Sequence, residues 1–521
     1  MEPLVVVLAV LVAIAALYWV ATRIGVPYPT LFVLGGLALA FVPGVPRIVL
    51  DPDLVLLVFL PPLLFIAATE TPIRELRTNI APITRLALGL VIVTILVVAA
   101  VAQWLVPSFG IAAAFTLGAI VAPTDALAAT TVFRRLGAPR LVQTLVEGEA
   151  LFNDATALVA FRAGVAAVAA GGLLLIDTTV IGFVVAAVGG IAIGAIVGWL
   201  GAELLRRLDE PAVEVLLSFV IPFAAYLPAE QLGVSAVLAA VTCGLVIGSR
   251  LGRILTARSR LLWLFSWKMV GFVLNGFVFL LIGLELPEIV ESLQARGRIE
   301  IVGVVVAVSA AVVLTRFAWV YLSSLLPNSP YRQISRIDRP FAGRMRFIVG
   351  WAGLRGAVSL AAALSLPADF PERDLILLIT FAVILVTLVG QGATLPWLVR
   401  RATLNGPRNL DGDDDTLARE VAYQAGLEEI DRQRSVWPGH QPLMDRMESS
   451  LRDRTQHLAT EDPDETAERT QERIEHEQIQ LAVIAAQRQA VIDLRDSRRI
   501  NDETLRSIER ELDLEEIRME G

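Results

Sequence analysis

Long runs of apolar residues are the feature that most constrains how this 521-residue chain can fold. A run of about 20 apolar residues can span the hydrocarbon core of a bilayer as a helix. With 55% hydrophobic and only 18% charged residues, the chain also falls outside the composition of ordinary soluble domains. The sequence therefore predicts an all-α membrane protein with about 13 transmembrane helices. The predicted runs lie near residues 4–22, 29–43, 53–69, 85–106, 111–133, 142–170, 173–204, 212–228, 233–249, 261–286, 300–326, 345–367 and 374–399.

The distribution of arginine among the predicted loops indicates the orientation. If the N-terminus lies outside, most loop arginines fall in inward loops, and cytoplasmic loops typically carry such a basic excess. The exceptions, which fall in outward loops, are Arg47, Arg296, Arg298 and Arg373. We therefore expect a multi-pass protein of the plasma (inner) membrane, with its N-terminus outside and its C-terminus in the cytoplasm.

The chain changes character after about residue 403. Residues 1–403 form the apolar transmembrane part, whereas residues 404–521 are rich in Arg and Glu and hold the acid excess behind the formal net charge of −8. We expect the second part to be an acidic, helical cytoplasmic tail that phosphates would repel, so no nucleic-acid partner is expected. Helix-compatible stretches lie near residues 416–434, 442–458 and 466–499, with a break at Trp437-Pro438-Gly439.

Residues 147–162 place three carboxylates in a segment that is otherwise apolar enough to cross a bilayer. A charge at mid-membrane costs at least roughly 2.5–3.5 kcal/mol on insertion scales, so it is retained mainly where it faces a partner, an ion or water. All three histidines lie beyond residue 403, which leaves proton chemistry in the membrane to carboxylates. We interpret Asp154 as the carrier of a cation and a proton in a secondary transporter. Burial favours the neutral acid and a nearby cation favours the carboxylate, so one group can take either.

Two of the predicted membrane helices contain helix breakers. Residues 118–125 (GAIVAPTD) place a proline and Asp125 in mid-span, and proline removes a backbone hydrogen bond, which frees carbonyls near Thr124 to coordinate a cation. Residues 350–357 (GWAGLRGA) carry three glycines around Arg355. Two broken helices, the middle members of helix triplets 4–6 and 11–13, match inverted-repeat transporters, whose sites lie where such helices meet.

The three acids Glu147, Glu149 and Asp154 lie on two different faces of the predicted helix and need different partners. On a helix, Glu147 and Asp154 are seven residues apart and share a face, whereas Glu149 lies on a nearly opposite one. A buried arginine is the natural partner of Glu149, and Arg355 in the other broken helix is the best candidate. Asp154 then remains, together with Asp125, to hold a monovalent cation. Further candidate partners of Glu149 are Arg316 and Arg162.

Three motifs together resemble the first family of monovalent cation:proton antiporters, which includes prokaryotic and animal sodium/proton exchangers. They are residues 122–125 (APTD), 147–154 (EGEALFND) and 353–359 (GLRGAVS), and the resemblance extends over about residues 1–400. It implies a homodimer of 13-helix subunits, each with a six-helix core built from helices 4–6 and 11–13. It also implies alternating access by movement of that core.

The resemblance further implies that Asp154 binds the cation or the proton. The remaining ligands would come from Asp125, Asn153 and the Thr124 carbonyl. Asn153 in place of a second aspartate is typical of the electroneutral branch, which exchanges one proton for one cation. No cofactor is expected, because the bound species are the transported H⁺ and Na⁺ (or Li⁺ or K⁺).

Two positions depart from the family's pattern. Many relatives carry Glu where this chain has Ile66, and some have Ser as a cation ligand where this chain has Ala150. Without these two side-chain oxygens, water completes the coordination of the cation, or the site favours a less strongly hydrated ion such as K⁺.

The sequence thus predicts a Na⁺/H⁺ antiporter, with a K⁺-selective cation/proton antiporter as an alternative. Uptake of an organic anion is disfavoured, because acids outnumber bases around the proposed site. A third hypothesis, from a different class, is a membrane sensor that acts through its cytoplasmic tail. No Gly-x-x-x-x-Gly-Lys loop is present, so ion gradients must supply the free energy, and no enzymatic activity is expected.

Overall fold

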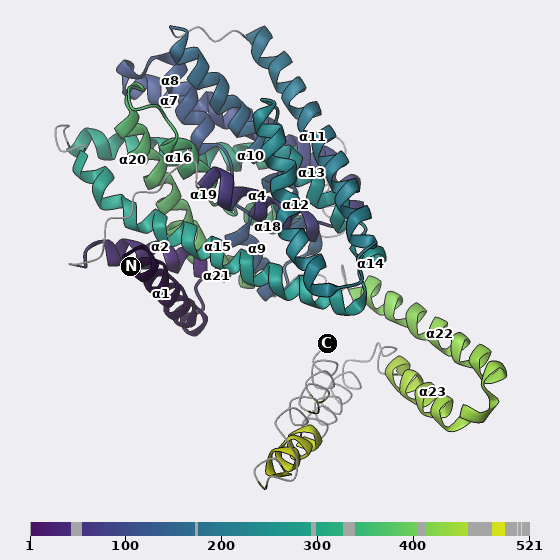
Figure 1. Cartoon of the computed structure of the whole chain (residues 1–521). Coiled ribbons are helices and arrows are strands. Elements are labelled where there is room, and N and C mark those ends of the chain that lie inside the picture. Colours follow the sequence, from purple (N-terminus) through teal and green to yellow (C-terminus); the bar gives the residue numbers. More distant parts are fainter. Residues whose placement is uncertain are drawn as a thin grey trace. The chain divides into compact units, whose positions relative to one another are not determined.

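A computed structural model describes most of the chain (Figure 1). The described residues form helices, with no strand among them, which confirms the predicted all-helical fold. By its internal contacts the chain divides into two compact units, residues 1–406 and 407–521. The described residues are 2–42, 55–171, 176–292, 298–326, 339–403, 412–456 and 482–494, together with Ser497, Ile508 and Leu512.

Eight helices in the described ranges are long and apolar enough to cross a membrane. They are Val7–Ile24, Ile80–Leu105, Arg140–Ala169, Ile181–Arg206, Pro211–Gln231, Ala257–Glu285, Ile299–Ser324 and Arg373–Ala402. The shorter apolar helices are Tyr28–Ala40, Leu57–Glu70, Pro107–Val121 and Ala236–Gly248. The first unit is therefore a multi-pass membrane domain, and the number of 13 spans stays a prediction.

The longer helices of the first unit are α1 (Glu2–Ile24), α2 (Tyr28–Ala40), α4 (Leu60–Glu70), α7 (Val91–Leu105), α8 (Gly110–Val121), α9 (Leu127–Leu136), α10 (Arg140–Ala169), α11 (Ile176–Arg206), α12 (Pro211–Gln231), α13 (Ala236–Gly248), α15 (Ala257–Ser292), α16 (Arg298–Ser324), α18 (Arg339–Trp351), α19 (Ala357–Leu364), α20 (Arg373–Leu385) and α21 (Gly392–Thr403). Short helices are α5 (Ile73–Thr78), α6 (Ile80–Thr84) and α14 (Leu251–Ile254). Three π-helical turns, η1 (Val55–Phe59), η2 (Arg85–Leu90) and η4 (Val386–Gln391), and one 3-10 turn, η3 (Pro107–Phe109), extend some of them.

Small residues let helices approach closely inside the membrane domain. Lipid tails are as apolar as leucine, so helix association in a bilayer depends on packing more than on the exclusion of water. α2 and α15 pack against each other through Gly36 and Gly283, where an added methyl group would collide with the backbone of the facing helix. Glycine at both positions therefore sets the distance between these two helices.

Two clusters of buried apolar side chains organise the membrane domain. The larger cluster contains side chains of α7, α8, α9, α16 and α18–α21, and the smaller cluster contains side chains of α4, α11, α12, α13 and the first turns of α15. Both α10 and α15 contribute side chains to the two clusters, and in α10 Val146 and Phe161 belong to the larger cluster whereas Leu151 and Ala155 belong to the smaller one. The helix that carries the predicted ion carrier therefore runs along the boundary between the two clusters.

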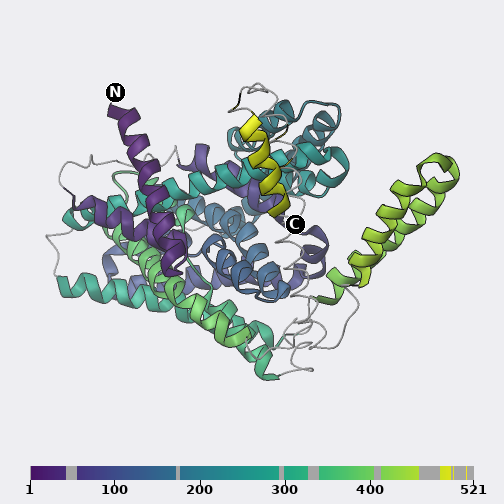
Figure 2. The same ribbon diagram turned by 90° about the horizontal axis from the view of Figure 1, so that it is seen from below.

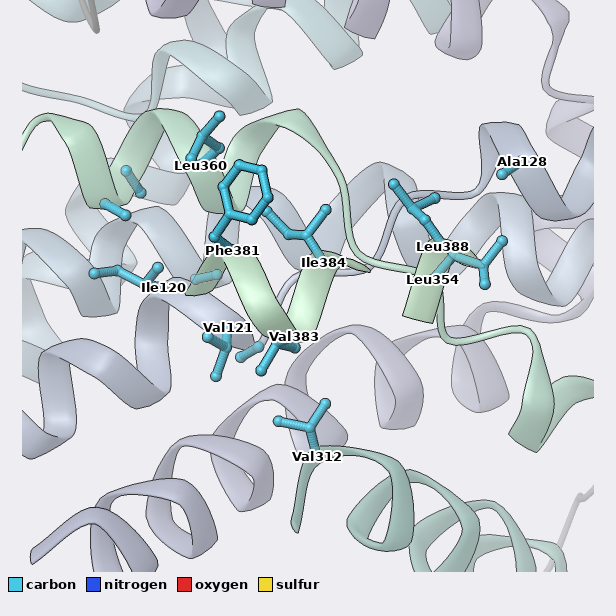
Figure 3. Packing of buried hydrophobic residues seen from close by; sticks show 14 of the residues in the cluster. Ile120, Val121, Ala128, Val312, Leu354, Leu360, Phe381, Val383, Ile384 and Leu388 are labelled. Atoms are coloured by element: carbon cyan, nitrogen blue, oxygen red, sulfur yellow. The ribbon is translucent and has the colours of Figure 1, made fainter. Parts of the chain in front are cut away.

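Both predicted helix breaks are present. α8 ends at Val121 and α9 begins at Leu127, with residues 122–126 outside helical structure. In the same way, residues 352–356 separate α18 from α19. Proline in the first segment and glycine in the second disfavour a continuous helix, as the sequence predicts. Figure 3 shows apolar side chains around the breaks, including Ile120, Val121, Leu354, Ile384 and Leu388.

The second unit contains a helical hairpin. α22 (Gly412–Val436) and α23 (Gln441–Gln456) pack side by side, joined by the 3-10 turn η5 (Pro438–His440) (Figures 1 and 2). The turn coincides with the predicted break at Trp437-Pro438-Gly439. Of the third predicted tail helix, residues 482–494 are helical. Residues 466–481, 495–496 and 498–499 of that stretch lie outside the described residues.

Candidate cation site

The two helix breaks meet and are bonded to each other. The Asp125 N–H donates to the Leu354 carbonyl at 2.8 Å, and the Arg355 guanidinium donates to the Ala122 carbonyl at the C-terminal end of α8. Asp125 Oδ1 accepts the Leu127 N–H at 2.8 Å and so caps the N-terminus of α9. A helix carries partial negative charge at its C-terminus and partial positive charge at its N-terminus. Each of these ends therefore faces a side chain of opposite charge.

The glycines around Arg355 leave space for buried charged side chains. A methyl group at Gly356 would collide with the carboxylate of Asp125, and one at Gly353 would collide with the side chain of Arg316. The glycine-rich pattern therefore does more than interrupt a helix, because it lets two side chains from other helices lie against bare backbone.

The partner of Glu149 is Arg316, so the predicted pair of Glu149 with Arg355 is wrong. Both Arg316 terminal nitrogens donate to the Glu149 carboxylate, one of them at 2.9 Å, and both side chains are at most 2% exposed. Arg316 Nε also donates to the Val349 carbonyl at 3.1 Å. Arg355 instead lies within the second break and reaches Ala122, because the free carbonyls at the end of α8 lie against it.

Asn153 and Thr124 connect α10 to the first break. Asn153 Nδ2 donates to Thr124 Oγ1 at 2.6 Å and to the Thr124 carbonyl at 3.2 Å. Thr124 Oγ1 in turn donates to Glu149 Oε1 at 3.0 Å. The carbonyl predicted to bind a cation thus already accepts one hydrogen bond, which leaves its second lone pair for a ligand. Asn153 Oδ1 is buried and has no hydrogen-bond partner in the described part of the chain.

Asp154 lies in the wall of a cavity of about 360 Å³. Thr124 and Asp125 line the same cavity, so three of the four predicted ligands share one space. Asp154 is only 9% exposed. Ile66 and Ala150 also line this cavity, so the two missing oxygens would have faced the cavity. Their replacement leaves apolar walls on that side.

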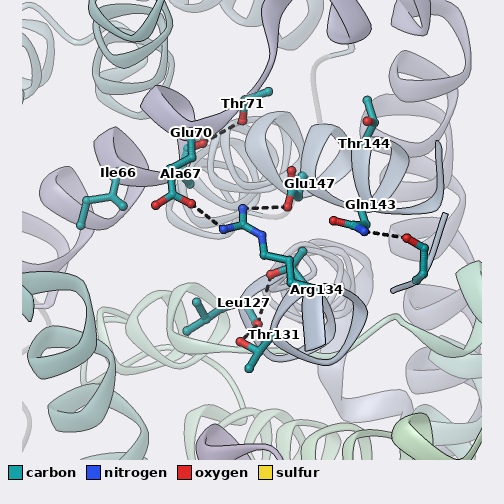
Figure 4. A network of polar contacts seen from close by, with 12 residues as sticks. Ile66, Ala67, Glu70, Thr71, Leu127, Thr131, Arg134, Gln143, Thr144 and Glu147 are labelled. Atoms are coloured by element: carbon teal, nitrogen blue, oxygen red, sulfur yellow. Dashed lines mark hydrogen bonds and ion pairs between the residues drawn. The ribbon is translucent and has the colours of Figure 1, made fainter. Parts of the chain in front are cut away.

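An arginine lies between two acids in the wall of this cavity (Figure 4). Arg134 of α9 contacts Glu70 of α4 at 2.9 Å and Glu147 of α10 at 3.1 Å. All three residues line the cavity with Asp154. Arg134 was not predicted as a site residue, because it directly follows the predicted membrane run 111–133 and is expected in a loop. The signal that could have indicated this part of the site is the seven-residue spacing of Glu147 and Asp154, which predicts that both lie on one helix face.

Further polar residues of the cavity wall were also not predicted as site residues. Among them are Lys268 and Asn275 of α15 and Ser359 of α19. The Ser359 hydroxyl is buried and unpartnered within the described ranges. These residues come from helices distant in sequence from α10, and no spacing within one helix could have indicated them.

Two interrupted helices that meet beside a buried carboxylate and a cavity define a secondary transporter built on broken helices. A family model described as "Sodium/hydrogen exchanger, transmembrane" matches residues 7–401. The chain belongs to the sodium/hydrogen exchanger family, which confirms the family predicted from the three motifs.

Individual relatives agree with this assignment. The chain is 35% identical over 529 residues to an uncharacterized Na⁺/H⁺ exchanger of Mycobacterium tuberculosis, which covers 98% of this chain and 96% of the relative. It is 35% identical over 390 residues to the "sodium, potassium, lithium and rubidium/H⁺ antiporter" of Bacillus subtilis, covering 72% of this chain and 58% of that one. The solved structure of the sodium proton antiporter MjNhaP1 from Methanocaldococcus jannaschii has a similar fold, with a TM-score of 0.58 and 18% identity over 78% of this chain and 99% of that chain.

Proposed function

We propose that this protein exchanges protons for Na⁺, or for Li⁺ or K⁺, and that Asp154 carries the cation and the proton in turn. One observation supports this most directly. Asp154 lines the cavity, and no hydrogen bond or ion pair joins its side chain to another residue of the described chain. Glu149 is neutralised by Arg316, and Asp125 has one oxygen committed to the cap of α9. Asp154 is thus the carboxylate of this group that is free to exchange ligands.

The exchange follows from competition for one group. A cation in the cavity would be held by Asp154 and Asp125, with the Thr124 carbonyl and Asn153 Oδ1 as neutral ligands. When the cation leaves, a buried carboxylate without a counter-ion is costly, so a proton replaces it. Asn153 is neutral in both states. Because one carboxylate changes its ligand, one proton moves for one monovalent cation, and the exchange is electroneutral.

The apolar wall bears on which ion is carried. Ile66 and Ala150 supply no oxygen, so the cation keeps more of its own water or is one that loses water easily. In both cases we expect the site to accept several monovalent cations and not Na⁺ alone. The printed name of the Bacillus subtilis relative, which includes four alkali cations, supports this proposal.

The remaining parts of the proposal concern the whole assembly. Residues 1–403 transport ions in the plasma (inner) membrane, with the N-terminus outside, and residues 404–521 form a cytoplasmic tail. The transporter works by alternating access, contains inverted repeats and acts as a homodimer in the control of pH and cation content. The arginine bias of the loops supports the orientation, and the position of α10 between two apolar clusters supports relative movement of helices along it.

The test is proton movement in proteoliposomes after addition of Na⁺, Li⁺ or K⁺, with the membrane potential clamped. The wild type should show cation-dependent proton flux, and Asp154→Asn should reduce it to the background while the protein still assembles. Asp369→Asn, the same change at an exposed loop position, is the matched control and should keep full activity. Exchange retained by Asp154→Asn would refute the assigned role. No flux with any cation in the wild type would refute antiport.

A further inference from the structure

A second cavity lies beside the other half of α10. It measures about 420 Å³ and is lined by α10 from Ala155 onward, by Ala170 directly after it, and by residues of α11, α12, α13 and the turn between α12 and α13. The first cavity contacts α10 from Glu147 to Asp154. The two cavities therefore meet α10 at consecutive residues and extend toward opposite ends of a helix that is long enough to cross the membrane.

The second cavity does not include Asp154 among the described residues that line it. Its wall nearest to that carboxylate consists of Ala155 and Leu158, both apolar. Ala155 is 3% exposed and belongs to the smaller apolar cluster, in contact with the helices that face α10. In this conformation the carboxylate is thus reached from the first cavity and separated from the second by a thin layer of apolar packing.

An ion pair in the wall of the second cavity joins α10 to α12. Arg162 Nη2 donates to both carboxylate oxygens of Glu230, at 2.6 and 2.9 Å. The two side chains are 51% and 34% exposed, so the pair contributes little to the stability of the fold. Its position is more informative than its strength. Arg162 lies about 12 Å along α10 from Asp154, at 1.5 Å per residue.

The pair also crosses the boundary between the two apolar clusters. α12 belongs to the smaller cluster, whereas Phe161, which precedes Arg162, belongs to the larger one. On the side of the first cavity, the contact of Arg134 with Glu70 of α4 crosses the same boundary. Ion pairs thus join the two clusters at both ends of α10, one beside each cavity.

We propose that the second cavity is the closed access route from the opposite face of the membrane, and that Arg162 and Glu230 form the latch that keeps it closed. Separation of the pair would let α10 move away from α12 and α13, so that Ala155 and then Asp154 become exposed to the second cavity. This inference rests on the alternating access proposed above. It assigns a role in access to two residues that do not contact the cation.

The test measures exposure of the cavity floor without any need for transport. The buried Cys243 is first replaced by alanine, so that the protein has no other thiol. In this Cys243→Ala background, Ala155→Cys reports the opening through its reaction with a membrane-impermeant thiol reagent. Arg162→Gln and Glu230→Gln should each label about two- to fivefold faster, the factor expected for loss of an exposed ion pair. The charge-swapped protein with Arg162→Glu and Glu230→Arg should return toward the slow rate.

The matched control is Arg206→Gln, which removes an exposed ion pair with Glu203 inside α11 and should leave labelling unchanged. Unchanged labelling in both single variants would overturn the proposal, as would a swapped protein that labels as fast as the single variants. Thermal stability of each variant, measured in parallel, separates opening from unfolding.

A second measurement asks whether the latch must open during transport. In the same background, Arg162→Cys with Glu230→Cys is linked by a short bifunctional thiol reagent. Linking should abolish cation-dependent proton flux, and full flux in the linked protein would overturn the latch. If the wild-type protein shows no exchange with any cation, the proposed function fails, whereas the labelling result stands on its own.

Discussion

Buried charges near Asp154 differ in how they are compensated, and that difference decides what each residue does. Glu149 has two charge-assisted hydrogen bonds from Arg316 and a third from Thr124. A carboxylate so completely paired has little freedom to take up a cation. Asp154 lies on the same helix, four residues after Ala150. It has no such partner and lines the cavity instead.

Removal of Arg316 should therefore be more harmful than removal of Arg355. Arg316→Gln leaves the buried Glu149 charge uncompensated and should destabilise the protein by about 3–5 kcal/mol. Arg355→Gln removes a hydrogen bond to the Ala122 carbonyl and should cost about 1–3 kcal/mol. Thermal unfolding of the purified proteins in detergent measures both effects. Adding Glu149→Gln to Arg316→Gln should restore part of the loss, and a larger effect for Arg355→Gln would contradict the observed pairing.

At the scale of elements, the crossing of the two helix breaks depends on backbone proximity. The Asp125 N–H bond to Leu354 holds the two segments together, and Gly356 leaves room for the Asp125 side chain. Local sequence decides that each helix is interrupted. The bonds between the interrupted helices decide where the carboxylates lie.

Gly356→Ala tests this close approach. The added methyl group collides with the Asp125 carboxylate, so overpacking should destabilise the protein by about 1–3 kcal/mol and should lower the exchange rate, because Asp125 lines the cation cavity. Gly303→Ala in α16 is the control, since no atom lies within 4 Å of its added methyl group. Thermal unfolding and proteoliposome flux measure both. Equal effects of the two substitutions would show that the crossing tolerates the extra volume.

The tail hairpin is held by charged contacts at its surface. Arg434 of α22 donates to Asp445 and Glu448 of α23, each at 2.7 Å. Hydrogen bonds from Arg434 and then Arg452 lower the pKa of Glu448 below its usual range. A lowered folded-state pKa means that the contribution is present above the ordinary glutamate pKa of about 4.3 and is lost as the pH falls through the folded-state pKa.

We therefore expect the hairpin to loosen in acid and in Arg434→Gln. Amide hydrogen exchange of residues 412–456 in the full-length protein, corrected for the intrinsic effect of pH, should be about two- to fivefold faster in Arg434→Gln at neutral pH. Arg432→Gln is the control, because Arg432 pairs with Glu429 within α22 and does not join the two helices. Exchange in α23 that is the same in both variants would show that apolar contacts alone hold the hairpin.

At the scale of the whole molecule, the division into two units predicts that transport does not depend on the tail. All predicted ligands and both cavities lie in residues 1–406. A variant that ends at residue 403 should therefore keep cation-dependent proton flux in proteoliposomes, at a rate within a fewfold of the full chain. A full-length protein that exchanges ions and a truncated one that assembles without exchange would assign the tail an essential part in transport. A sensor would show no exchange in either form.

Much of this organisation could be read from the sequence because it depends on local properties of the chain. Apolar runs predict membrane helices, Pro123 and the glycines around Arg355 predict the two breaks, and the Asp154 motif predicts the family. The seven-residue spacing of Glu147 and Asp154 correctly places both on one face of α10, toward one cavity. Each of these inferences needs only neighbours along the helix.

The tertiary structure alone decided which charges meet. Two arginines are buried in the described part of the chain, Arg316 of α16 and Arg355 of the second break, and spacing within α10 cannot say which of them approaches Glu149. That choice depends on how α16 and the second break pack against α10, which places Arg316 beside the carboxylate and Arg355 beside the end of α8. The same holds for Arg134 and for the two cavities, because they are formed by residues distant in the chain. Helix formation is a local property, whereas ion pairing and cavity shape depend on distances between helices.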